Sequence, residues 1–158
     1  MELQLASVIQ YKLLKFVGKE VALPLFMDNI TTISTILYSF KGSEPKQTTP
    51  TLKNELDKSD LAHKIVTISE FIKRMSEENY KAQEIHIHLC GIYEILDNIK
   101  LELEKIREEN DYIKTSWYHY TIGWTYFSSS VNVQNMKSLI TLLDNRYDML
   151  LKVLMATR

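Results

Sequence analysis

Residues 84–88, with the sequence EIHIH, hold the side chains that most resemble a metal site. They place two imidazoles, His86 and His88, within four residues of the Glu84 carboxylate. Imidazole nitrogens and carboxylate oxygens are common ligands of zinc and other first-row metals. On a strand, His86 and His88 would point to the same side, whereas on a helix they diverge and only Glu84 and His88 share a face. The secondary structure of this stretch therefore decides whether it could bind a metal.

The apolar residues around this stretch are spaced as in a helix. From residue 85 to residue 106 they alternate steps of four and three, which places them along one helix face. His86 and His88 then fall on opposite flanks of that face. A metal site of the bundle type also needs Glu-x-x-His on two helices, and the sequence contains no Glu-x-x-His. We therefore interpret both residues, and His63, as ordinary surface or flank histidines, and we expect no bound metal and no cofactor. The apolar series is Ile85, Leu89, Ile92, Leu96, Ile99, Leu103 and Ile106.

Other sequence motifs of catalysis are also missing. The single cysteine, Cys90, excludes an internal disulfide framework. The sequence has no HExxH, no Walker A loop, no GxGxxG and no GxSxG. The acid-rich run 101–111 places Glu and Lys three and four residues apart, which is typical of a solvated helix face. These observations favour a protein that is not an enzyme.

The segment 111–127 is unusual because it holds seven aromatic side chains and a histidine. Its residues form two stripes with alternating steps of four and three, so a helix here would be aromatic on two sides. Such a helix is central in a core, lines a small-molecule pocket or contacts a protein partner. We assign one stripe to the core: Ile113, Trp117, Tyr120, Trp124 and Phe127. The other stripe is the candidate partner-binding face: Tyr112, Ser116, His119, Gly123 and Tyr126.

The hydrophobic periodicity predicts the fold class. One apolar face recurs in each of five regions, and no region shows a convincing period of two. All three prolines lie in the first fifty residues. The pattern predicts an all-α fold: one domain over residues 1–158, built as an antiparallel bundle of five to six helices. The Leu and Ile heptad positions of 85–106 also suit an oligomeric coiled coil, but we favour the bundle because the other faces need covering. The five regions are 3–17, 26–40, 61–75, 85–106 and 133–154.

Several boundaries follow from composition. The stretch KGSEPKQTTPT, residues 41–51, predicts a flexible loop. We expect the third helix to begin between residues 52 and 59 and to end near 76–79, and the fourth to run from about 80 to 109. The register of 85–106 continues into 112–127, so 80–127 could be one helix. Asn110 at a heptad core position and the charges around it favour a break near 109–111. Asn132 is the expected N-cap of the last helix.

Composition and charge limit the possible partners and location. The formal net charge is −1 and the pI is about 6.4, which gives no electrostatic footprint for nucleic acid. We see no signal peptide and no 18-residue apolar run, so we expect a cytoplasmic protein without a membrane span. The resulting hypothesis is a non-enzymatic interaction module. It would self-associate as a homo-oligomer, or bind a partner helix or peptide, through the aromatic face at 112–127. The alternative is a bundle whose aromatic pocket binds or transforms a small molecule.

Limited proteolysis tests the boundary prediction. Because residues 41–51 carry two prolines, a glycine and few apolar anchors, a protease should cut there before it cuts any other internal site. Mass spectrometry of the first fragments would locate the cut. A first cut inside 85–106 would contradict the assignment.

Overall fold

In the computed structural model, the residues that the structure describes are 18–42, 50–115 and 130–156. They are almost entirely α-helical, and they contain no strand. This confirms the prediction of an all-α bundle. The helices are α2 (Lys19–Gly42), α3 (Pro50–Ser59), α4 (Leu61–Arg74), α5 (Glu77–Lys81), α6 (Gln83–Thr115) and α8 (Ser130–Ala156).

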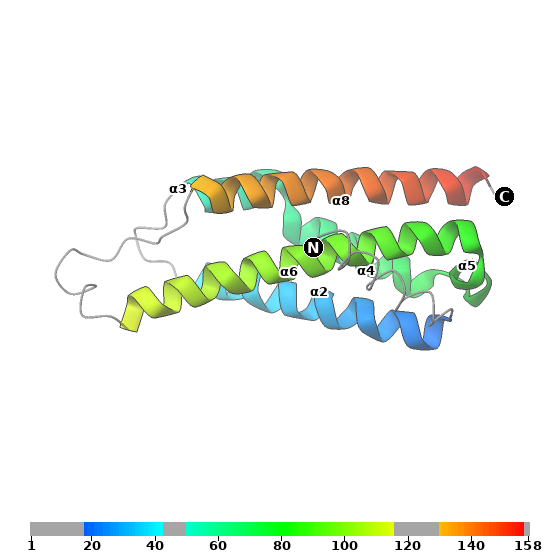
Figure 1. The fold of residues 1–158 in the computed structure, drawn as a ribbon, viewed down its shortest axis with the longest axis horizontal. Coiled ribbons are helices and arrows are strands. Elements are labelled where there is room, and N and C mark those ends of the chain that lie inside the picture. The colour runs from blue at the N-terminus through cyan, green and yellow to red at the C-terminus, as the bar shows by residue number, and fades with distance from the viewer. Residues whose placement is uncertain (1–17, 43–49, 116–129, 157–158) are drawn as a thin grey trace, which may run out of the picture.

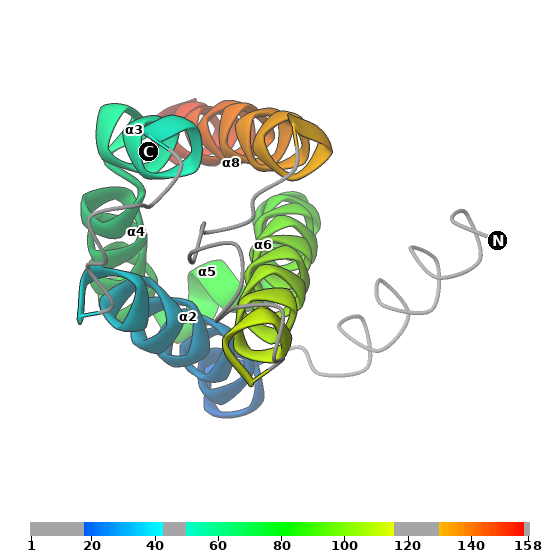
Figure 2. The same cartoon turned by 90° about the vertical axis from the view of Figure 1, so that its left-hand side faces the viewer.

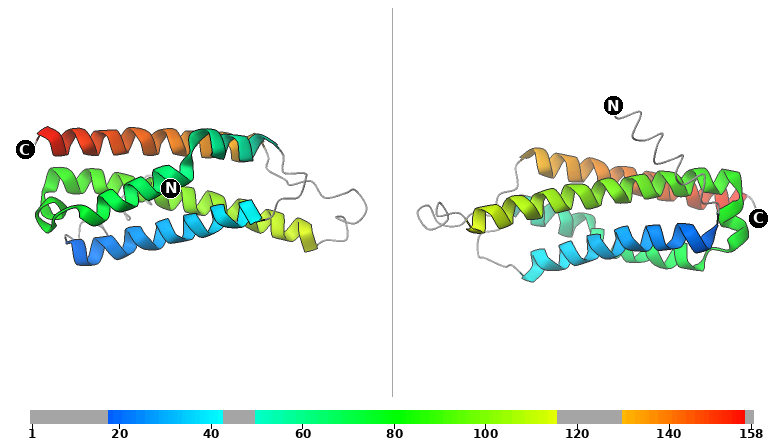
Figure 3. Two further views of the ribbon diagram at one scale, coloured as in Figure 1. Left: turned by 180° about the vertical axis from the view of Figure 1, so that it is seen from behind. Right: turned by 60° about the horizontal axis from the view of Figure 1, so that its bottom comes forward.

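Four long elements surround a common core in the ring order α2, α4, α8, α6 (Figure 2). Along the chain, α2, α4, α6 and α8 alternate in direction (Figure 1). Side-chain contacts agree, because Arg146 of α8 lies beside Gly91 of α6 while Asn132 lies beside Glu109. The connection from α4 to α6 therefore crosses the ring, and α5 makes this crossing at one end of the bundle. As a result, α2 and α6 are neighbours that run in the same direction (Figure 3).

The predicted apolar faces form the core. Every member of the α6 series from Ile85 to Ile106 is at most 2% exposed. On α4, the whole predicted face from Leu61 to Met75 is buried. The faces of α2 and α8 are buried in the middle and partly exposed at some ends, as at Phe40. The α6 face is the wall against which α2, α5 and α8 pack.

The expected third helix is split into α3 and α4. The break is at Asp60, which adopts the left-handed conformation with φ 53° and ψ 44°. This bend turns α3 toward the first half of α8, where Leu52 becomes 1% exposed. The helix also begins earlier than expected, at Pro50, a residue that suits the first helical turn. Of the predicted loop, both ends belong to helices, and residues 43–49 lie outside the described residues.

A separate short helix, α5, replaces the expected end at 76–79. Ser76 caps it by accepting a hydrogen bond from the backbone N of Asn79 at 3.2 Å. Tyr80 is 1% exposed and donates its hydroxyl to the Ile72 carbonyl of α4 at 2.7 Å. Tyr80 therefore belongs to the closure of the bundle end and is not the start of the next helix.

The same end holds the beginning of α2. The Glu77 carboxylate accepts a hydrogen bond from the backbone N of Lys19 at 2.9 Å, so α5 caps the N-terminus of α2. The Lys19 ammonium in turn donates to the Lys73 carbonyl at 2.6 Å, near the C-terminus of α4. Gly18 suits this junction because a Cβ there would lie 3.2 Å from a Glu77 oxygen.

Two boundary predictions around α6 and α8 are wrong. α6 continues through 109–111 to Thr115, so the expected break does not occur. Asn110 and its charged neighbours cost a helix only tenths of a kcal/mol each, which is too little to end it. α8 begins at Ser130, so Asn132 is not its N-cap. Asn132 is instead buried inside the helix and donates to Glu109 at 3.4 Å.

The hydropathy of α2 is notable. In the part of the chain that the structure describes, α2 alone is long and apolar enough to cross a membrane, over Lys19–Phe40 with a mean hydropathy of 1.3. A core helix of a bundle has the same length and composition, and 39% of this stretch is buried against the other helices. The absence of a membrane span stays a prediction.

Substitution of Asp60 tests the bend between α3 and α4. A β-branched residue is strained in the left-handed region, so Asp60→Val should lower the free energy of unfolding by about 1–2 kcal/mol. Asp60→Gly should change it by less than about 0.5 kcal/mol, because glycine adopts this conformation freely. Asp57→Val, on the exposed side of α3, is the matched control. Urea denaturation would measure all three, and equal effects of the two valine substitutions would contradict the bend.

Candidate functional site

The predicted partner-binding face lies almost wholly beyond the described residues. The backbone of α6 includes position 112, but the side chain of Tyr112 lies outside the described residues, as do Ser116, His119, Gly123 and Tyr126. The structure therefore neither brings these five residues together nor separates them. They remain a prediction from their spacing.

The histidines divide according to their place on the helices. His63 is exposed, as expected. His88 is partly buried on α6, whereas His86 is only 5% exposed. His86 lies on a flank of the apolar face, as predicted, and it is buried there and not at the surface. Helical geometry separates His86 from His88 and aligns it instead with Cys90, one turn further along.

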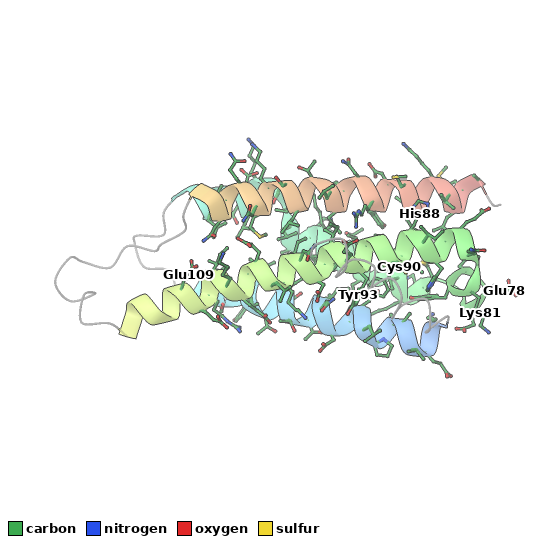
Figure 4. The ribbon with its side chains drawn as sticks, viewed as in Figure 1. Glu78, Lys81, His88, Cys90, Tyr93 and Glu109 are labelled. Atoms are coloured by element: carbon green, nitrogen blue, oxygen red, sulfur yellow. The ribbon has the colours of Figure 1, made fainter. Side chains whose placement is uncertain are left out.

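His86, Cys90 and Tyr93 form a second row on α6, and we call it the polar flank. They are spaced four and three residues apart, so the row runs beside the apolar face. Its last member, Tyr93, lies on the side of α6 that faces α2 (Figure 4). The Tyr93 ring packs edge-on against Phe26 of α2, with centroids 5.6 Å apart and planes at 87°. The Cys90 Sγ lies 3.6 Å from the Nε2 of His86. The polar flank is thus the side of α6 that faces α2.

The facing side of α2 also carries a row that the sequence analysis missed. Ala22, Asn29 and Ile36 repeat every seven residues and are all buried. Asn29 is 2% exposed, and its side chain faces the Tyr93 hydroxyl closely enough to lower the pKa of that group. Burial of a polar side chain is costly unless that side chain is hydrogen-bonded. The sevenfold repeat is visible in the sequence, but Asn29 interrupts its apolar pattern.

The chemistry of the polar flank is set by burial. Burial raises the pKa of the Cys90 thiol to about 11. Burial, and then the negative charge of Asp97, raise the pKa of the Tyr93 hydroxyl, while Lys100 and the Asn29 amide act in the opposite direction. A nucleophilic cysteine needs a lowered pKa, because the thiolate is the reactive form. At neutral pH Cys90 is therefore protonated, and the contact with His86 does not form an activated Cys–His pair.

The described side chains do not form a metal-binding site. Within residues 18–42, 50–115 and 130–156, no group of three or more His, Cys, Asp or Glu residues is arranged to hold a metal ion. Glu84 is exposed and His88 is partly buried, and no third ligand joins them there.

Charged side chains are used to connect helices. Arg146 of α8 donates to the Gly91 carbonyl at 2.7 Å and to the Glu94 carboxylate at 3.1 Å. Gly91 leaves the room for this crossing, because a Cβ there would lie 3.4 Å from the Arg146 Cδ. Lys64 of α4 binds Asp144 of α8 at 2.8 Å. These groups support the seams of the bundle.

Comparison with known proteins adds no relative. Neither protein-family models, nor curated proteins, nor solved structures give a significant match to this chain. The function must therefore be argued from the residues and their arrangement.

Alkylation of Cys90 tests the electrostatics of the polar flank. A pKa raised from 9.0 to about 11 lowers the thiolate fraction near pH 7.5 by about 100-fold. Native protein should therefore react with iodoacetamide at least about 100-fold more slowly than urea-unfolded protein at the same pH. The native rate should also rise about tenfold per pH unit between pH 7 and 9, where the thiolate is still a minor form. Mass spectrometry would follow the reaction, and equal native and unfolded rates would contradict a buried thiol.

Proposed function

We propose that the chain is a non-enzymatic protein-interaction module. It self-associates as a homo-oligomer, or binds a partner helix or peptide, through the aromatic face predicted at 112–127. The residues proposed to make contact are Tyr112, Ser116, His119, Gly123 and Tyr126.

The observation that carries this proposal is the extension of α6. The helix passes Glu109, which lies opposite Asn132 near the start of α8, and continues to Thr115. Its C-terminal end, yellow in Figure 1, extends past the ends of α2 and α8, as Figure 3 also shows. The bundle helices that cover the rest of α6 do not reach this end. A partner could therefore approach the segment after this end without displacing α2 or α8, and we infer that its aromatic side chains make the contact.

The composition of the face supports a protein partner. Tyrosine and tryptophan are enriched among residues that carry most of the binding energy at protein interfaces. A helix with two aromatic sides can place one on its own chain and one on a partner. In the helix-in-groove mode, anchors three and four residues apart make that contact, and the steps from Tyr112 to Tyr126 have this spacing.

The described polar groups give no support to an enzyme. Cys90 is a buried, protonated thiol, and its His86 neighbour does not activate it. Arg146, Glu94 and Lys64 are used in contacts between helices. The interaction proposal needs none of these groups to react.

We also propose that the module works in the cytoplasm without a membrane span and without nucleic acid. Phe26, Ile33 and Ile36 on α2 are at most 1% exposed, and insertion of α2 into a bilayer would remove them from this core. The net charge of −1 offers no attraction to nucleic acid.

Paired substitutions separate the proposed contact face from the core. Trp124→Ala should lower the free energy of unfolding by about 3–5 kcal/mol if that ring is core. Tyr126→Ala, or Gly123→Leu, which adds a bulky side chain to the proposed face, should leave the melting temperature nearly unchanged and weaken self-association. Thermal melts and analytical ultracentrifugation on the same samples would measure both effects.

Two outcomes would contradict this assignment. If Tyr126→Ala unfolds the protein as strongly as Trp124→Ala, the second stripe is core. If Tyr126→Ala changes neither stability nor association while the wild-type chain self-associates, another surface makes the contact. Binding of a small aromatic ligand beside His119 would instead favour the pocket hypothesis.

A further inference from the structure

The outer side of the seam between α6 and α8 carries four exposed, large apolar side chains. Ile87 and Leu101 of α6 are 58% and 53% exposed, and Leu142 and Met149 of α8 are 42% and 53% exposed. Single exposed apolar residues are common, so the placement of these four decides whether they form a contact face. We infer that this face binds a second copy of the chain about a two-fold axis perpendicular to the helices.

On α6, the apolar pair is placed evenly about a salt bridge. Ile87 lies seven residues before Glu94 and Leu101 lies seven residues after it, so all three share one row of the helix. The Glu94 carboxylate lies 3.1 Å from the Arg146 guanidinium of α8. The row therefore borders α8, and the salt bridge marks its middle.

On α8, the apolar pair is centred on the same salt bridge. Leu142 lies four residues before Arg146 and Met149 lies three residues after it, so these side chains share one side of α8. The two helices lie side by side and run in opposite directions (Figure 1). Met149 is therefore near the level of Ile87, and Leu142 is displaced toward the level of Leu101.

Even placement about one centre is what a two-fold contact requires. In an isologous dimer, residue i contacts residue j of the other copy, and j contacts i in return. A two-fold axis through the salt bridge packs α6 antiparallel to α6 of the second copy and sets Ile87 against Leu101 of that copy. The same axis sets Leu142 of α8 against Met149 of the second copy. A different protein would not require the two ends of this face to match.

Charge is complementary about the same axis. Glu84 and Lys105 are both exposed on α6, three residues before Ile87 and four residues after Leu101. They are about 31 Å apart along the helix, too far to pair within one chain. In the antiparallel dimer, each Glu84 meets Lys105 of the other copy, so an ion pair lies at each end of the α6 contact.

The face is large enough for a dimer. It is about 31 Å long from Glu84 to Lys105, and the two helices are together about 20 Å wide. This gives a flat area of about 600 Å², to which the relief of the side chains adds, against roughly 800 Å² per partner in a standard interface. The face is also separate from the aromatic face proposed at 112–127, because even Thr115 lies about 21 Å beyond Leu101.

Sedimentation of charged variants tests the face. Leu101→Glu places a carboxylate in the apolar contact and should weaken dimerisation at least about tenfold. Its melting temperature should change little, because Leu101 is already exposed. The matched control is Val66→Glu, because Val66 is 55% exposed but lies on α4. Analytical ultracentrifugation and thermal melts on the full chain would measure both.

The same measurements in a Tyr126→Ala background separate the two proposals. Dimers that persist in Tyr126→Ala and are lost when Leu101→Glu is added support the inference, whether or not the aromatic face binds a partner. A monomeric wild-type chain, or equal dimerisation of Leu101→Glu and Val66→Glu, would overturn it.

Disulfide trapping tests the position of the axis. Asn145 is exposed between Leu142 and Met149, so the axis brings it close to its own equivalent. In a Cys90→Ser background, Asn145→Cys should form disulfide-linked dimers on mild oxidation. Lys137→Cys is exposed on the same helix, but two copies of it would be about 24 Å apart and should not link. Non-reducing electrophoresis would show the products, and equal linkage of the two variants, or none at Asn145→Cys, would overturn the inference.

Discussion

The buried apolar face of α6 is the constraint on which the rest of the bundle depends. Its seven residues from Ile85 to Ile106 are at most 2% exposed, and α2, α5 and α8 all pack against this helix. Full burial of one such side chain stabilises the fold by about 1.5–3 kcal/mol. Because several helices pack against the same apolar face of α6, contacts on its two flanks determine the orientation of each neighbouring helix. Arg146 and Gly91 connect one flank to α8, and Tyr93 and Phe26 connect the other flank to α2.

The end of the bundle that holds α5 determines the order in which the helices are connected. α5 crosses from α4 to α6, so the chain reaches the opposite side of the ring before α6 begins (Figure 2). Tyr80 holds this crossing through its hydrogen bond to the Ile72 carbonyl, and burial raises the pKa of its hydroxyl, so it remains a donor even at alkaline pH. Glu77 ties the start of α2 to the same turn. The diagonal crossing is the reason that α2 and α6 run in parallel as neighbours.

Periodicity predicted the long elements and failed at single residues. The face from Ile85 to Ile106 could be read from spacing because many residues repeat the same signal. The left-handed Asp60 could not be read in this way, because a single residue leaves no period in the sequence. The predicted break at Asn110 overestimated one polar residue at a core position, although α6 continues past it. The polar flank was missed for a related reason: polarity along α6 does not show which polar side chains the neighbouring helices bury, as they do His86. The proposed contact face stays a prediction from residue spacing, because its side chains lie outside the described residues.

The buried polar groups are better explained by helix pairing than by reaction chemistry. Asn29 occupies a position in the α2 row where Ala22 and Ile36 are its sevenfold neighbours, and burial of a polar side chain there costs stability. In coiled coils, a polar residue at a core position fixes register at a cost in stability. Asn29 lies opposite the polar flank, at the seam where two helices run in parallel without a short connecting loop. Because no short loop aligns α2 with α6, side chains must favour one register of the two helices. The contact between Phe26 and Tyr93, beside Asn29, favours such a register. The same burial that fits Cys90 into this seam also keeps its thiol protonated. Alignment of α2 with α6 and low reactivity of the polar flank therefore have one physical cause.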